Sequence, residues 1–124
     1  MNVKIDTKEK FTVLTPGVTE ISANMTGNLI ETLQSYLKND IPHIVLNLNA
    51  VNSIDKSSAE KLSTLQQEFY EKNCSFIICA LQPTVESTFD SLELLEVMNV
   101  TATESEAWDI IQMEEIEREL MGDE

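Results

Sequence analysis

Short apolar runs alternate along the chain with stretches in which apolar residues recur every three or four positions. The runs predict strands, and the recurring positions predict helices with one face on a sheet. In the first helix Met25, Leu29, Leu33 and Leu37 form such a stripe. We expect strands over 3–6, 11–15, 43–48, 74–80 and 97–101. We expect helices that start near 25, 59, 83 and 103.

This order of elements predicts an α/β fold with a central mixed β-sheet of about five strands and about four helices. The first two strands are close enough along the chain to form an antiparallel pair, and the later strand-helix-strand units favour parallel, right-handed crossovers. The run at 74–80 is apolar throughout, which is typical of a strand buried on both faces. We expect one domain over 1–112, followed by an acidic helix end and tail over 113–124.

Capping and aromatic residues predict where the last helix begins and which helical side chains pack in the core. Thr103-Glu104-Ser105-Glu106 is a capping-box pattern that predicts the start of the last helix. Apolar positions at helical spacing are more often core than ligand sites. We therefore assign to packing the aromatic residues Phe69, Tyr70, Phe89 and Trp108. After the capping box, the last helix also contains the apolar residues Ile111, Ile116 and Leu120.

The net charge restricts the class of partner. The 124 residues include 22 acidic and 8 basic side chains, for a formal charge of -14. Such a charge repels nucleic acid and anionic membranes, so neither is expected as a partner. The segment 104–124 contains nine acidic residues and one basic residue, Arg118. A solvated helix face is the favoured interpretation, and an acidic docking arm for a basic partner is the alternative.

The sequence offers little for catalysis, cofactors or membrane insertion. Cys74 and Cys79 fall on opposite faces of one strand, so we expect reduced, buried thiols. His43 is the only histidine and should lie at the far end of the sheet from the serines at 57 and 58. Three glycines cannot form a phosphate-binding loop. The start Met1–Asp6 lacks a signal-peptide core, and no apolar run approaches the ~20 residues that span a bilayer. We expect a cytoplasmic, non-catalytic protein without metal or cofactor.

The most informative segment follows the strand over 43–48. A short polar loop leads through Ile54-Asp55 to Lys56, Ser57 and Ser58 and into a helix. Open α/β sheets usually engage ligands or partners where strands end and helices begin. Together with the run over 75–80 and Leu81-Gln82-Pro83, this order of elements resembles a STAS domain, and the resemblance extends over about 3–111.

The resemblance implies a regulatory function. STAS domains include the bacterial anti-sigma factor antagonists, which regulate transcription, and cytoplasmic domains of sulfate transporters. Such an antagonist binds an anti-sigma factor that is also a serine kinase and so frees the sigma factor. Phosphorylation by the kinase ends the binding, and a phosphatase resets the cycle. For this chain the resemblance implies the same class of partners, with the protein as a monomer or a weak homodimer.

The chain departs from the family at the switch itself. The family pattern is Asp, an acceptor Ser or Thr, then Ser or Ala, then Gly, and the ungapped alignment places Lys56 on the acceptor. Phosphorylation could shift to Ser57 or Ser58, where the helix N-terminus and Lys56 would stabilise the added charge. Ser57 could instead be a helix cap, because Ser57-Ser58-Ala59-Glu60 reads as a capping box, and we favour this interpretation. The switch could also be lost.

The resemblance places the partner-binding face on the start and the exposed side of this helix. Asp55 could take the role of the family acid or complement the helix N-terminus. Alternative functions are a switch-free STAS interaction or scaffold module, a decoy, or, less favoured, a small nucleotide-binding protein or enzyme. The predicted partner-binding residues are Asp55, Lys56, Ser57, Ser58, Lys61 and Thr64, with Glu60 and Gln67 beside them.

Overall fold

The computed structural model describes residues 2–122. Twelve elements follow one another in this part of the chain. The strands are β1 (Val3–Thr7), β2 (Thr12–Pro16), β3 (Glu20–Ile21), β4 (Ile44–Asn47), β5 (Ser53–Ile54), β6 (Phe76–Cys79) and β7 (Val100–Thr101). The helices are α1 (Ala23–Ser35), the short 3-10 helix η1 (Tyr36–Lys38), α2 (Lys56–Glu71), α3 (Pro83–Ser91) and α4 (Glu104–Gly122).

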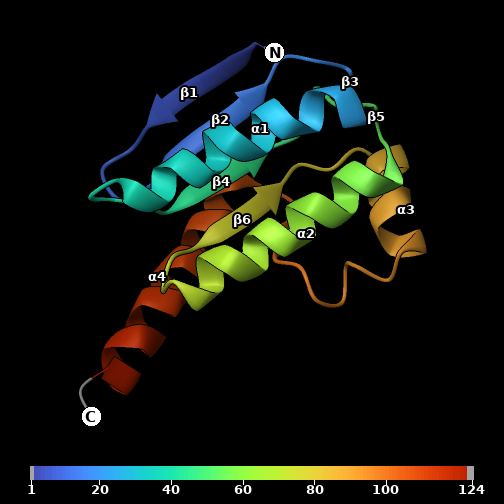
Figure 1. The fold of residues 1–124 in the computed structure, drawn as a ribbon. Coiled ribbons are helices and arrows are strands. Elements are labelled where there is room, and N and C mark those ends of the chain that lie inside the picture. Colours follow the sequence, from blue (N-terminus) through green and yellow to red (C-terminus); the bar gives the residue numbers. More distant parts are fainter. Residues whose placement is uncertain (1, 123–124) are drawn as a thin grey trace.

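The central sheet has the predicted mixed topology. Its five strands lie in the order β1-β2-β4-β6-β7, with β1 antiparallel to β2 and the remaining pairs parallel. Figure 1 shows α1 and α2 side by side on one face of this sheet and α4 on the other. The α/β fold with a five-stranded mixed sheet and four α-helices is therefore confirmed.

Side chains alternate between two cores across the sheet. In β6, Phe76 and Ile78 point into the core under α1, α2 and α3. Ile77 and Cys79 point into the core under α4. This alternation is the period-two pattern of a strand, and it explains why a strand buried on both faces is apolar throughout. The two thiols behave as expected, since Cys74 and Cys79 are buried, free and in different cores.

The prediction that Tyr70 packs in the core is wrong. Tyr70 is 61% exposed, although Phe69 and Phe89 are fully buried and Trp108 stacks on Phe11. Ile116 and Leu120 are also exposed, because the carboxyl half of α4 extends past the edge of the sheet (Figure 1). The predicted start of α4 is present, with the Glu106 N–H donating to Thr103 Oγ1 over 3.1 Å and the Thr103 hydroxyl donating to Glu106 Oε1 over 3.2 Å.

A small second sheet was not predicted. It consists of β3 and β5, which run parallel with Glu20 opposite Ser53 and Ile21 opposite Ile54. Each strand has two residues, too few to give a periodic pattern in the sequence. This sheet fixes the chain immediately before α1 and α2, and it therefore positions the candidate site.

Candidate partner-binding site at the start of α2

Asp55 joins the small sheet to α2. Its N–H donates to the carbonyl oxygen of Ile21 over 3.1 Å, and its own carbonyl accepts from the N–H of Ala59 over 3.0 Å. Its backbone is extended, as expected for the residue that precedes a helix. The last residue of the polar loop is thus held on both sides by backbone hydrogen bonds, and the direction in which α2 leaves the loop is fixed.

The carboxylate of Asp55 caps two helices at once. Oδ1 accepts a hydrogen bond from the N–H of Ser58 in α2 over 2.8 Å, and Oδ2 accepts one from the N–H of Ala23 at the start of α1 over 2.7 Å. Ser22, the residue before α1, makes no capping bond with its own side chain. An acidic side chain between two helix N-termini is favourable for both helix dipoles. Asp55 therefore couples the positions of α1 and α2.

Hydrogen bonding determines the charge state of this carboxylate. Bonds with the side chain and the backbone N–H of Ser58, then the Ala23 N–H and the charge of Lys61, lower the pKa of Asp55 below its ordinary value. The stabilisation by Asp55 is therefore present at pH values above the pKa that it has in the unfolded chain. It is lost as the pH falls through the lower pKa of the folded state.

We expect Asp55→Asn to lower the free energy of unfolding by about 1 kcal/mol at neutral pH, because the amide replaces only one of the two acceptor oxygens. Urea unfolding of both proteins from pH 7 to about pH 3 checks the expectation, since the difference should shrink as Asp55 becomes protonated. A difference that stays constant over this range would show that the carboxylate charge contributes nothing.

Ser57 does not cap α2, and the favoured interpretation of this residue is wrong. The residue before the helix is Asp55, so Ser57 is the second residue inside α2. Its side chain is exposed and makes no hydrogen bond within residues 2–122. The predicted capping box is not formed because aspartate caps a helix as well as serine does, and Asp55 comes two residues before Ser57.

Ser58 and Ser57 have opposite environments. Ser58 is fully buried where α1 crosses α2, and its hydroxyl hydrogen-bonds with that of Thr26. The Thr26 hydroxyl also donates to the carbonyl oxygen of Ser22 over 2.8 Å. A kinase cannot reach the Ser58 hydroxyl without separating α1 from α2. Of the two candidate acceptors, only Ser57 is accessible in this structure.

The remaining predicted partner residues lie on the solvent side of α2. Lys56, Lys61 and Thr64 are exposed, as are the flanking residues Glu60 and Gln67. A face with accessible polar side chains on a rigid helix is suited to binding a protein partner. The structure thus brings Asp55, Lys56, Ser57, Lys61 and Thr64 together at one surface, and it places Ser58 beneath that surface.

Hydrogen bonds connect the loop over 48–52, which precedes β5 and α2, to the start of α3. Gln82 Nε2 donates to the carbonyl oxygen of Asn49 over 2.7 Å, and the Thr84 hydroxyl donates to that of Asn52. Val51 is fully buried under the loop. These contacts, which a sequence motif does not reveal, hold the loop in one conformation next to the start of α2.

A comparison of the sequence with protein-family models identifies the family of this chain. A model of the STAS domain matches residues 2–107, which is most of the chain. The chain belongs to the STAS domain family.

Several solved structures superpose well on this chain. A candidate anti-sigma factor antagonist from Thermotoga maritima is 18% identical, with a TM-score of 0.79 over 89% of this chain and 94% of that protein. An anti-sigma factor antagonist from Mycobacterium paratuberculosis is 14% identical, with a TM-score of 0.77 over 90% and 93%. The phosphorylated Bacillus cell fate determinant SpoIIAA is 17% identical, with a TM-score of 0.64 over 89% and 99%. At these identities the likeness shows a shared fold.

His43 of this STAS domain lies away from the start of α2. It precedes β4, whereas Asp55 follows that strand's carboxyl end. Its Nδ1 accepts from the N–H of Ser75 over 3.1 Å, and its Nε2 lies 3.2 Å from Glu115 Oε1. Burial, together with the charge of Arg118, lowers the pKa of His43. The histidine connects β4, β6 and α4 and does not face Ser57.

Two further findings describe residues 2–122 as a whole. No helix in this range is long and apolar enough to cross a membrane. No group of three or more histidine, cysteine, aspartate or glutamate side chains in the same range could hold a metal ion.

Proposed function

We propose that this STAS domain is a non-catalytic regulatory protein that binds an anti-sigma factor with serine kinase activity through the start of α2. The observation that carries the proposal is the rigid, exposed helix start at Asp55, fixed by hydrogen bonds to α1, α2 and the small sheet. A preorganised surface loses little conformational freedom on binding, which favours recognition of a protein partner. The similarity in fold to anti-sigma factor antagonists supports this class of partner.

We further propose that the phosphoryl acceptor is Ser57 rather than the residue at position 56. Lys56 has no hydroxyl, and Ser58 is buried. A phosphoryl group on Ser57 would add roughly -1.5 to -2 charges next to the α2 N-terminus. Lys56 precedes it, and Lys61 lies one turn further along the helix. With this charge on the contact surface, the phosphorylated protein would bind the partner more weakly than the unmodified protein does.

The test uses the purified anti-sigma factor kinase of the source organism. Isothermal titration should show that the wild type and Ser57→Ala bind it with similar affinity, and that Ser57→Glu binds at least about tenfold more weakly. Incubation with magnesium and ATP should place one phosphate on Ser57 of the wild type and none on Ser57→Ala. Ser87→Glu, which changes an exposed serine on α3, is the matched control and should bind normally.

The outcomes separate the alternatives. Binding without phosphate on Ser57 would overturn the shifted acceptor and leave a switch-free antagonist or decoy. Equal weakening by Ser57→Glu and Ser87→Glu would contradict the placement of the interface. Failure of the folded wild type to bind any such kinase would contradict the proposed partner class, and it would leave a scaffold module in another signalling complex as the function to test.

A further inference from the structure

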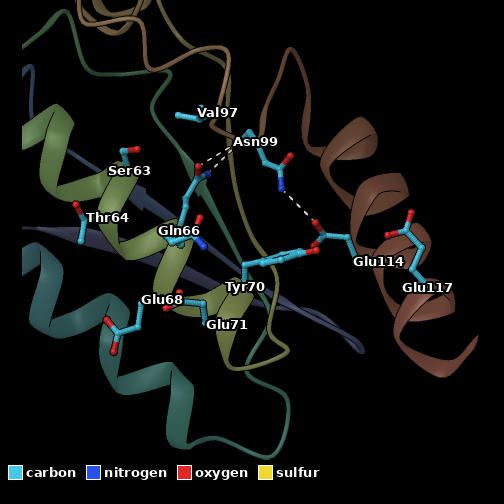
Figure 2. Close-up of a pocket in the computed structure, with 11 residues that line it drawn as sticks. Ser63, Thr64, Gln66, Glu68, Tyr70, Glu71, Val97, Asn99, Glu114 and Glu117 are labelled. Atoms are coloured by element: carbon cyan, nitrogen blue, oxygen red, sulfur yellow. Dashed lines mark hydrogen bonds between the residues drawn. The ribbon is translucent and has the colours of Figure 1, made fainter. Parts of the chain in front are cut away.

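A groove runs between the carboxyl halves of α2 and α4, away from Ser57. Its main part has a volume of about 870 Å³, and a second part of about 500 Å³ continues past Tyr70 toward Met121. Figure 2 shows the main part, with α2 side chains on one wall and Glu114 and Glu117 of α4 on the other. Val97 and Asn99 come from the segment before β7. The groove reaches the middle of α2 at Thr64 and Gln67, the part of the predicted partner-binding face that is farthest from Ser57.

The groove combines apolar surface with negative charge. Tyr70, Val97 and Met121 are 61%, 75% and 74% exposed, so the groove leaves three largely apolar side chains uncovered. Single exposed apolar residues are ordinary, but three that line adjoining parts of one groove form a surface suited to a partner. Of the carboxylates around it, Glu71 and Glu117 make no ion pair or hydrogen bond within residues 2–122.

The inner wall of the groove is preorganised. Gln66 is buried, its Nε2 donates to the carbonyl oxygens of Phe76 and Asn99 over 3.0 Å each, and its Oε1 accepts from the Asn99 N–H over 3.1 Å. Asn99 Nδ2 donates to Glu114 Oε2 over 3.2 Å (Figure 2). These bonds connect α2, β6, the segment before β7 and α4. The shape of the groove therefore does not depend on flexible side chains alone.

The far end of the groove is also held by polar contacts. Glu114 Oε1 accepts a hydrogen bond from the Ser75 hydroxyl over 2.6 Å, and Arg118 reaches both groups, at 2.5 Å from Ser75 Oγ and 3.4 Å from Glu114 Oε1. Arg118 is the only basic residue among 104–124, and its guanidinium pairs with Glu114 of the same helix. The carboxyl half of α4 thus presents an uncompensated negative surface while it remains fixed to β6.

We propose that this groove binds a cationic amphipathic segment of a partner protein. Exposed apolar side chains in the groove would pack against the apolar side of that segment, and Glu71 and Glu117 would face its lysine or arginine residues. Arginine would also stack well on the exposed ring of Tyr70. A second copy of this chain is disfavoured as the occupant, because two surfaces of the same negative charge repel each other.

The test titrates the full chain with a synthetic amphipathic peptide of leucine and lysine, followed by two-dimensional NMR and fluorescence anisotropy. Chemical shifts should change at Tyr70, Val97 and Asn99. Glu71→Lys combined with Glu117→Lys should weaken binding at least about tenfold. The matched control combines Glu31→Lys with Glu86→Lys, exposed on α1 and α3, which changes the net charge from -14 by the same amount and should change affinity less than about twofold.

Two further comparisons make the result decisive. Ser57→Glu should leave peptide binding unchanged. Failure of the peptide to bind the groove can therefore be distinguished from failure of the kinase to bind the start of α2. A leucine and glutamate peptide of the same length should not bind. Equal weakening by both lysine pairs, shift changes outside the groove, or binding of the acidic peptide would each overturn the proposal, because each would indicate attraction to the net charge or to apolar surface in general.

Discussion

Ser58→Glu is expected to lower the free energy of unfolding by at least about 4 kcal/mol, the largest effect that we predict. The Ser58 side chain is completely buried between α1 and α2, with its hydroxyl bonded to that of Thr26. Glutamate at this position would be too large for the space and would place a charge away from water. Urea denaturation followed by circular dichroism measures the loss.

Ser57→Glu is the matched control for this prediction. The substitution is the same and the position is adjacent, but the side chain is exposed in the first turn of α2. Negative charge near a helix N-terminus is weakly favourable, so stability should change by less than about 0.5 kcal/mol. Equal destabilisation by both substitutions would contradict the placement of Ser58 inside and Ser57 outside.

Gln66→Leu is expected to lower the free energy of unfolding by about 3 kcal/mol. Leucine has a similar size but cannot replace the bonds to Phe76 and Asn99, so two carbonyl groups and one N–H lose a partner. Each buried polar group left without a partner carries a desolvation cost. Thermal and urea unfolding would measure the change, and the Asn99 amide should also exchange its hydrogen faster.

Gln67→Leu distinguishes this effect from a general cost of replacing glutamine in α2. Gln67 is the next residue along the helix and is exposed. Its replacement should change the free energy of unfolding by less than about 0.5 kcal/mol. If Gln66→Leu were equally mild, the buried amide network would not hold the groove, and the preorganised wall between α2 and β7 would lose its support.

The sequence predicted the central strands of the sheet well because these strands have to be apolar. β4 and β6 are covered on both faces, so their continuous apolar runs distinguish them from the helices. The stripe from Met25 to Leu37 follows from the single buried side of α1 and η1. These elements, together with Asp55 and the hydroxyls after it, were enough to indicate the STAS family.

The finer features depend on contacts between segments that are distant in the sequence. Asp55 bonds to Ala23, 32 residues earlier, and Gln66 bonds to Asn99, 33 residues later. No local pattern shows that one aspartate caps two helices, or that a glutamine in α2 is buried. The same limit explains the error at Ser57, since a local capping motif was given more weight than the aspartate that precedes it.

The most direct test of the central claim is photo-cross-linking in the cells of origin. A photoreactive amino acid replaces Ser57 in one variant and Glu31, an exposed residue on α1, in another. Mass spectrometry then identifies the cross-linked proteins. We predict that the variant at position 57 captures an anti-sigma factor with a serine kinase domain and that the variant at position 31 does not. Absence of such a cross-link from a folded, normally expressed variant at position 57 would contradict the claim that the start of α2 binds this partner.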